Sequence, residues 1–247
     1  MARTRTSGRL WIKIALGVAA VLVAGGAVVL VNWMRTSPAF AVTRLETGRY
    51  RYSTVSEVEG VLLQRLGRNI WTCSRDSLRE DLEQLPWVRS VEITRRPPGT
   101  LAVRLQEWRP RLLMAAAGGD PDHALLADHR VLQLPAHVEA PELPIFRHGQ
   151  QTPTDEDLES LLILINAVAE SGLDARRNVV GITENGTDLI LDLGAETGRL
   201  LVGRESFMLR LRRYLAVADD LPPASSVDLR FDGQVYVKEL ETAQHAE

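Results

Sequence analysis

The stretch of sequence that decides the fold is LPWVRSVEITRRPPGTLAVRLQEWRP, from Leu85 to Pro110. Apolar residues alternate with polar ones before the corner RRPPG at residues 95–99, and again after it as far as Leu105. A period of two indicates strands with one buried face, and a proline-glycine corner between two such runs predicts a hairpin. The rest of the first domain is interpreted around these two strands.

Two amphipathic helices are predicted before the hairpin. Thr54 and Glu57 have the spacing of a capping box, and apolar residues follow them at helical intervals. A second helix is predicted over residues 75–84, and a strand-like run over residues 40–46 precedes both helices. The predicted order over residues 40–109 is strand, helix, helix, strand, strand, in which two helices can cover one face of a three-stranded sheet.

The N-terminal segment is long and apolar. From Leu10 to Val31 it contains one lysine and no acidic residue, which predicts a transmembrane helix over residues 10–32. Arginines come before this helix and the first acidic residue after it is Glu46, so the charge bias keeps the tail at residues 1–9 in the cytoplasm. The alternative is a signal peptide cleaved after AFA at residues 39–41. Both interpretations export the remainder of the chain.

Residues 110–240 are predicted to form a second, strand-rich α+β domain. Short apolar runs are separated by turn residues, and Asn185-Gly186 and Asp232-Gly233 are typical of hairpin turns. The tail at residues 241–247 is predicted to be disordered.

Two helices interrupt the strands of this second domain. The first is predicted to begin near Thr154, with Asp157 in the capping position and one apolar stripe made of Leu158, Leu161, Leu162, Ile165 and Val168. The second is predicted over residues 205–217, with Met208, Leu211 and Leu215 facing inward.

Composition and charge exclude some classes of protein. The chain of 247 residues is 45% hydrophobic and 25% charged, which is typical of a globular protein, and its net charge of −3 argues against a nucleic-acid binder. The single cysteine, Cys73, cannot form an intramolecular disulfide, and we expect it to be a half-buried structural residue beside Trp71.

No pattern typical of an enzyme is found. His123, Asp128 and His129 lack the helical histidine spacing or cysteine partner of a metal site. Ser206 lacks the second glycine of a nucleophile elbow. The sequence therefore predicts no catalytic residue, no metal, no cofactor and no small-molecule substrate.

The ordered blocks of the chain resemble the FtsQ/DivIB family of bacterial cell-division proteins. The resemblance in the first domain, which is similar to a polypeptide-transport-associated (POTRA) domain, rests on Leu85, Pro86, Trp87, Val88, Arg95, Arg96, Pro97, Pro98, Leu101, Glu107 and Pro110. In the second domain it rests on LLADHRVLQLP at residues 125–135, LLVGRES followed by RLRRYL, and VDLRFDGQVYV at residues 227–237. The chain departs from the family at Phe231, where a tyrosine is common, and at Pro97-Pro98, where an aromatic-proline corner is commoner.

The resemblance implies a non-catalytic scaffold of the divisome. Such a protein lies in the inner membrane with its N-terminus in the cytoplasm, and its periplasmic domains recruit other division proteins at the septum. The implied partners are FtsB and FtsL, with FtsB adding to the last strand of the second domain, and other divisome components are further candidates. The candidate partner-binding residues are Arg230, Phe231, Gly233, Val235, Tyr236 and Val237.

The residues themselves are compatible with this implied site. A C-terminal strand is often a sheet edge, where unpaired backbone groups can accept a partner strand. In QVYVKEL the alternation places Val235 and Val237 on one side and Tyr236 and Lys238 on the other. The alternative is an interior or hairpin strand whose hydrogen bonds are all satisfied.

Two further alternatives stay open from the sequence. The chain could be a membrane-anchored POTRA-type chaperone or docking module for exported polypeptides. The hairpin of the first domain could dock another exported segment or serve as a spacer, and Arg95 and Arg96 at its corner could meet an acidic partner, meet lipid headgroups or form a solvated turn.

Overall fold

The computed structural model describes residues 7–149, 152–173, 179–186, 188–194, 197–231 and 233–239, and it leaves the side chains of residues 7–10 and 239 undescribed. Contacts divide the chain into two compact units, residues 1–107 and residues 108–247. The predicted tail at residues 241–247 lies outside the described residues.

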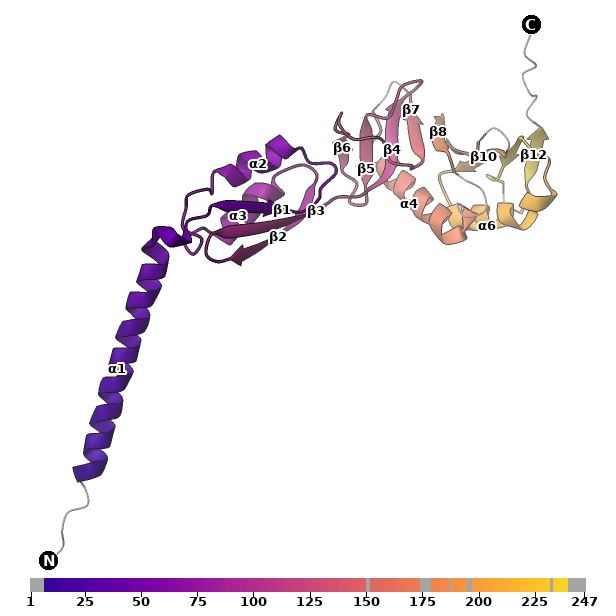
Figure 1. The fold of residues 1–247 in the computed structure, drawn as a ribbon. Coiled ribbons are helices and arrows are strands. Elements are labelled where there is room, and N and C mark those ends of the chain that lie inside the picture. The colour runs from indigo at the N-terminus through magenta and orange to yellow at the C-terminus, as the bar shows by residue number, and fades with distance from the viewer. Residues whose placement is uncertain are drawn as a thin grey trace, which may run out of the picture. The chain divides into compact units, whose positions relative to one another are not determined.

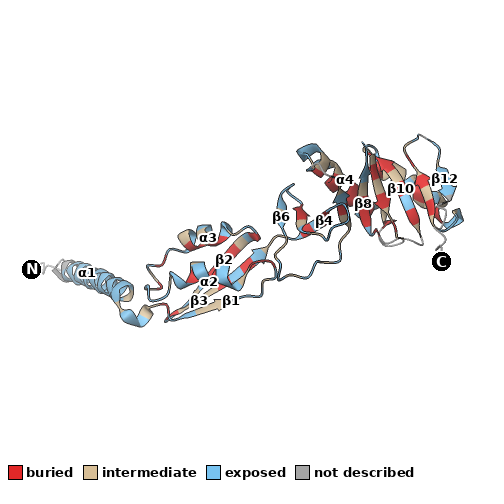
Figure 2. Cartoon of the chain, turned by 90° about the horizontal axis from the view of Figure 1, so that it is seen from above, coloured by how far each residue is buried: buried red, intermediate tan, exposed pale blue. Residues whose placement is uncertain are grey.

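The first element is a long apolar helix, α1 (Ser7–Thr36). Its segment Trp11–Thr36 is long and apolar enough to cross a membrane, with a mean hydropathy of 2.7, and none of it is buried by protein. Figure 2 shows this helix exposed along its described length. The predicted span ended at residue 32, and the helix continues for about one further turn, to Thr36, with Arg35 in its last turn.

The rest of the first unit is a three-stranded sheet with two helices (Figure 1). Its elements are the 3-10 turn η1 (Pro38–Phe40), β1 (Arg44–Thr47), α2 (Val55–Leu63), α3 (Arg75–Glu83), β2 (Val88–Arg96) and β3 (Thr100–Glu107). The strand order is β1-β3-β2, with β1 parallel and β2 antiparallel to β3. The predicted order of elements is confirmed, but the first strand begins at Arg44 and not at residue 40, because residues 38–40 form the 3-10 turn.

Both helices of the first unit begin where the sequence predicts. Thr54 and Glu57 form a complete capping box at α2, and the Ser74 hydroxyl accepts the backbone N–H of Ser77 at the start of α3. The apolar faces of the two helices cover one face of the sheet. The buried core consists of Val42, Val58, Leu62, Ile70, Leu78, Leu82, Val88, Val91, Ile93, Leu101, Val103 and Leu105.

The opening stretch is fixed at both of its ends to the segment at residues 51–53. Trp87 is buried and its ring stacks on Tyr52, with ring centroids 4.3 Å apart. The carboxylate of Glu107 accepts the backbone N–H groups of residues 51, 52 and 53 at 2.6, 2.9 and 2.6 Å. Three bonds to one carboxylate are charge-assisted and hold this loop against the end of β3.

Cys73 is 5% exposed, so it is fully buried and not half-buried as predicted.

The described residues of the second unit include one nine-stranded sheet and the helices α4 and α6 (Figure 1). The strands are β4 (Pro110–Ala116), β5 (His123–Leu126), β6 (Val131–Gln133), β7 (Ile145–His148), β8 (Gly181–Asn185), β9 (Asp188–Asp192), β10 (Gly198–Gly203), β11 (Ser225–Asp228) and β12 (Tyr236–Glu239). The helices are α4 (Asp155–Ser171), α6 (Phe207–Val217) and the 3-10 turn η2 (Ala218–Asp220). The strand order is β12-β11-β10-β9-β8-β7-β4-β5-β6.

The two helices lie on the same face of this sheet because of its connectivity. α4 joins the parallel neighbours β7 and β8, and α6 joins the parallel neighbours β10 and β11. Both crossovers step in the same direction along the sheet from strands that run the same way, so the right-handed rule puts both helices on one side. Figure 1 shows this arrangement. The other face of the sheet carries no helix among the described residues.

The predicted details of these helices need three corrections. Thr154 is the N-cap of α4, and Asp157 is the third helical residue, which closes the capping box. The second helix begins at Phe207 and not at residue 205. The residues of α6 that are buried are Phe207, Leu211 and Tyr214, whereas Met208 and Leu215 are only partly buried against the core. The predicted apolar stripe of α4 is buried as expected.

Of the two predicted turns, one can be compared with the structure. Gly186 has a φ of +65° between the paired strands β8 and β9, which is the conformation that a glycine supplies at a tight hairpin turn. Asp232 of the predicted Asp232-Gly233 turn lies outside the described residues.

Candidate functional site: the C-terminal edge of the sheet

The last described strand, β12, lies at the end of the nine-stranded sheet. It pairs antiparallel with β11, from Ser225 opposite Glu239 to Asp228 opposite Tyr236. Among the described residues no other strand pairs with β12, so its second side presents free backbone groups in the part of the chain that the structure covers. An edge of this kind can accept an added strand.

The position of β12 depends on how β11 is held against β10. These two strands are parallel, with Gly198 opposite Ser225. A Cβ atom on Gly198 would lie 1.9 Å from the carbonyl oxygen of Ser225, and the φ of Gly198 is +102°. Only glycine permits this approach of one backbone to another. The edge strand therefore rests on a β10–β11 contact that has no room for a side chain.

Arg230 is the centre of an ion-pair cluster beside this edge. Its guanidinium donates to Asp188 at 2.6 Å and to both carboxylate oxygens of Asp228, at 2.6 to 3.1 Å. The hydrogen bond from Arg230 lowers the pKa of Asp228 below its ordinary value, against the opposing effect of burial. The same partners raise the pKa of Arg230 above its ordinary value. Arg230 thus ties the end of β11 to the start of β9.

Helix α6 supplies two more arginines to the connection between β11 and β12. Arg210 donates to the backbone oxygen of Val202 at 2.7 Å and to that of Arg230 at 3.3 Å. Arg213 donates to the backbone oxygen of Phe231 at 2.6 Å. These bonds hold the start of the connection against the helix.

An exposed aromatic and aliphatic cluster lies on the edge itself. Phe231 is 51% exposed, Tyr236 is 53% exposed and Val237 is 42% exposed. The rings of Phe231 and Tyr236 meet edge to face with centroids 5.1 Å apart, and the Tyr236 hydroxyl donates to Gln234 at 2.6 Å. Three exposed apolar side chains beside free backbone groups are typical of a contact site rather than of an ordinary surface.

The six predicted partner-binding residues therefore occupy different environments. Phe231, Tyr236 and Val237 are exposed, and Gly233 is exposed in a left-handed turn with a φ of +73°. Val235 packs partly buried against the core, whereas Val237 is exposed, so the two valines differ although the alternation put them on one side. The guanidinium of Arg230 is occupied by the two aspartates.

The sequence interpretation missed the residues that hold β11 and its connection to β12 in place. Asp188, Arg210, Arg213 and Gly198 come from β9, α6 and β10, and no short spacing connects them to the last strand. The one local signal is the pair Asp228 and Arg230 within the DLR triplet. A charged pair two residues apart at the end of a strand fits a structural ion pair.

The other histidine and acidic residues do not gather into a second site. The Nδ1 atom of His123 lies 2.9 Å from a carboxylate oxygen of Asp122. Asp128 pairs with Arg130 at 2.7 Å in the turn between β5 and β6. Within the described ranges no group of three or more His, Cys, Asp or Glu side chains could hold a metal ion. The best geometric candidate for function is therefore the C-terminal edge.

Comparison with known proteins identifies the first unit. Residues 47–108 match the family model described as POTRA domain, FtsQ-type. The matched segment begins at the last residue of β1 and covers the two helices and the hairpin, so it contains the fold-deciding stretch as far as Trp108.

Curated relatives extend the similarity over most of the chain. A cell division protein FtsQ from Allochromatium vinosum is 29% identical over 90% of this chain and 87% of its own length. The FtsQ of Rhodothermus marinus is 25% identical over 80% of this chain and 77% of its own length, and that of Shewanella oneidensis is 27% identical over 75% and 68%. The chain has an apolar N-terminal helix, a POTRA domain and a strand-rich second unit in this order, and over most of its length it is similar to FtsQ cell-division proteins.

Proposed function

We propose that this protein is a non-catalytic scaffold of the cell-division machinery, which recruits and links division proteins through the two units that follow its apolar helix. The relatives that align with most of the chain are cell division proteins by name. The observation that carries the molecular part of the proposal is the unpaired side of β12 beside an exposed aromatic pair.

The proposal places the protein across the inner membrane by α1. The arginine-rich tail stays in the cytoplasm, because positive charge before the first span is retained on that side. The POTRA domain and the second unit then lie in the periplasm, and the protein acts at the division septum.

The proposed partners are FtsB and FtsL, with a segment of FtsB adding to β12 as a further strand. Main-chain hydrogen bonds would supply much of the affinity, and side-chain contacts on alternate residues would supply the specificity. Phe231 and Tyr236 lie where such a strand would pass, and aromatic side chains in an interface often contribute more than their share of the binding energy. Arg230 has a positioning role, since its ion pairs hold the connection that presents these rings.

The aromatic pair can be tested separately from the backbone. We expect Phe231→Ser combined with Tyr236→Ser to weaken capture of the FtsB–FtsL pair by about tenfold or more, because each buried aromatic contact contributes about 1–2 kcal/mol or more. Both side chains are more than half exposed, so the free energy of unfolding should change little. The measurement is binding of purified FtsB–FtsL to the full-length protein in detergent.

The matched control is Leu209→Ser, because Leu209 is 58% exposed on α6 and lies outside the edge strand. Wild-type capture by this control, with loss in the double variant, supports the proposed contact. Equal capture by the double variant and the wild type contradicts it. If unrelated exported polypeptides compete with FtsB–FtsL for the same edge, the protein is a client-binding module of the chaperone type instead.

A further inference from the structure

Asn69 connects the POTRA domain to the end of the apolar helix. Its side-chain NH₂ donates to the backbone oxygens of Met34 at 2.9 Å and Ser37 at 3.1 Å, and its side-chain oxygen accepts the N–H of Trp71 at 2.9 Å. A helix leaves its last carbonyl groups without intrahelical partners, so this amide acts as a cap supplied from far along the chain. The loop that contains Asn69 is therefore held at the exit of α1.

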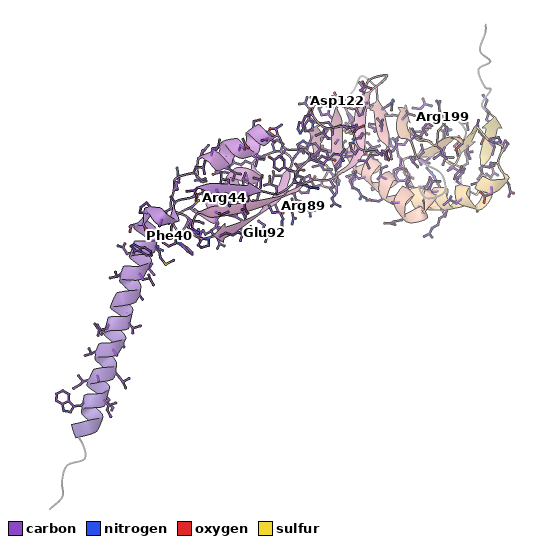
Figure 3. The ribbon with its side chains drawn as sticks, in the orientation of Figure 1. Phe40, Arg44, Arg89, Glu92, Asp122 and Arg199 are labelled. Atoms are coloured by element: carbon purple, nitrogen blue, oxygen red, sulfur yellow. The ribbon has the colours of Figure 1, made fainter. Side chains whose placement is uncertain are left out.

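Three aromatic rings, each in contact with the next, also connect the end of α1 to the loop that contains Asn69. Trp33 of α1 meets Phe40 edge to face with centroids 5.5 Å apart, and Phe40 meets Trp71 in the same manner at 6.2 Å. Figure 3 labels Phe40 where α1 joins the domain. Trp33 is 53% exposed at the end of the apolar span, and tryptophan side chains favour the headgroup region of a bilayer.

The corner of the β2–β3 hairpin lies at this same end of the domain. The carbonyl oxygen of Gly99 accepts the N–H groups of Thr43 and Arg44 at 2.9 and 3.2 Å. A Cβ atom on Gly99 would lie 2.3 Å from the carbonyl oxygen of Ala41, so the corner is packed against the segment that leaves the membrane. Residues 41 and 69 also form a β-bridge, which joins the two loops.

Among the described residues, the arginines at this end of the domain form two groups, those with partners inside the domain and those without. Arg95 and Arg96 of the corner have internal partners, because Arg95 donates to the backbone oxygen of Cys73 and Arg96 pairs with Glu46 at 2.7 Å. Arg35, Arg44 and Arg68 are exposed, and within the described part of the chain they make no side-chain hydrogen bond or ion pair. Three free guanidinium groups around the exit of a membrane helix complement an anionic surface.

Apolar side chains are exposed in the same region. Leu63 ends α2 at 54% exposure, and Leu66 lies in the following turn at 40% exposure. Leu66 is three residues before the Asn69 cap, and the backbone oxygen of Arg68 accepts the N–H of Val42 at 2.8 Å. Exposed leucine beside arginine is the composition of a surface that lies in a membrane interface.

We infer that this end of the POTRA domain is a lipid-contacting surface, which rests on the anionic headgroup layer at the exit of α1. The rim consists of Trp33, Arg35, Arg44, Leu66 and Arg68. The arginines bind phosphate groups, Leu66 and Trp33 enter the interface, and the Asn69 cap keeps the rim at the level where the helix ends. The POTRA domain is thereby held at a fixed height and tilt above the bilayer, which goes beyond its proposed role as a scaffold.

The test uses the full-length protein in bilayer nanodiscs with an environment-sensitive label at Leu66→Cys, in a background where the buried Cys73 is replaced by alanine. Lipids that carry a nitroxide quencher on the headgroup report contact with the label. The matched position is Val55→Cys, which is 57% exposed at the opposite end of α2. Eight residues of helix separate Val55 from Leu63, which corresponds to about 12 Å.

We expect strong quenching at residue 66, little at residue 55, and an increase at residue 66 when phosphatidylglycerol is added to phosphatidylcholine. Arg68→Glu should shift the ratio of docked to undocked rim by about fivefold or more in the anionic bilayer, since each arginine near such a surface contributes on this scale. Arg49→Glu is the charge control, because Arg49 follows the far end of β1 and is exposed. It should leave the quenching unchanged.

Equal quenching at residues 55 and 66 would overturn the inference, as would quenching that does not respond to anionic lipid or to Arg68→Glu. Protection of residue 66 that requires an added division protein, and not the lipid, would also overturn it, because the rim would then be a protein-binding surface. Binding of FtsB–FtsL is measured in parallel in detergent, so that failure of the lipid contact is distinguished from failure of the scaffold function.

Discussion

A proline at one of two adjacent positions on β12 should weaken partner binding by about tenfold or more without unfolding the protein. Successive residues of an edge strand point their N–H groups alternately to the neighbouring strand and to solvent. Tyr236 and Val237 pair with Asp228 and Val227 of β11, so one of the two donates into the sheet and the other faces outward. Tyr236→Pro and Val237→Pro therefore form an internally matched pair.

The two prolines should have different effects on the free energy of unfolding. The variant that loses a bond to β11 should lower the free energy of unfolding, whereas the outward variant should unfold close to the wild type, because proline is tolerated on the open side of an edge strand. The outward variant should nevertheless weaken FtsB–FtsL capture by about tenfold or more, since proline removes one main-chain donor and one lost hydrogen bond of about 1.4 kcal/mol corresponds to a factor of ten.

Val131→Pro at the opposite edge of the sheet, in β6, is the positional control and should retain capture. Thermal unfolding followed by circular dichroism checks that each variant is folded. If both β12 variants are folded and bind as well as the wild type, the partner does not add to this edge.

Gly198→Ala should have the largest effect on the stability of the second unit. Its new Cβ atom would lie 1.9 Å from the carbonyl oxygen of Ser225, and a backbone atom cannot move aside as a flexible side chain can. β10 and β11 must then separate, which breaks the ladder that supports β12. We expect a loss of about 3–5 kcal/mol, the scale of the most destabilising single substitutions.

The control for Gly198 is Gly186→Ala. Gly186 also has a positive φ, of +65°, but no atom lies within 4 Å of a Cβ atom built on it. It should cost only the backbone strain, about 1–2 kcal/mol. Differential scanning calorimetry of the full-length variants should show a Tm lowered by roughly 6–20 °C for Gly198→Ala, at about 2–4 °C per kcal/mol. Equal Tm values for the two variants would contradict the close approach of the two backbones.

The POTRA fold could be predicted because its signals are local. Each capping pair, helical spacing and period-two run is contained in one short segment of sequence, and Thr54, Glu57 and Ser74 act at the helix starts that the sequence indicates. The boundary errors also have local causes. Pro38 begins a 3-10 turn, which delays the first strand until Arg44, and Thr154 takes the N-cap position ahead of Asp157.

The candidate site could be predicted only in part because most of its construction is long-range. The exposed aromatic residues lie in one short segment, but the ion pair that joins Arg230 to Asp188 spans 42 residues. Gly198 and Ser225 are separated in the sequence by α6, and no periodicity in either strand predicts that they pair. Alternation alone put Val235 and Val237 together, whereas the core covers the first and leaves the second exposed.

The central claim is that a segment of FtsB becomes the next strand of the sheet, and hydrogen exchange of the full-length protein tests it most directly. Backbone amides are compared in the free protein and in the complex with FtsB–FtsL. We expect the outward-facing amide of Tyr236 or Val237 to become protected on binding, while amides of β6 at the other edge keep their rates. Unchanged exchange throughout residues 236–239 in a saturated complex would contradict strand addition at β12.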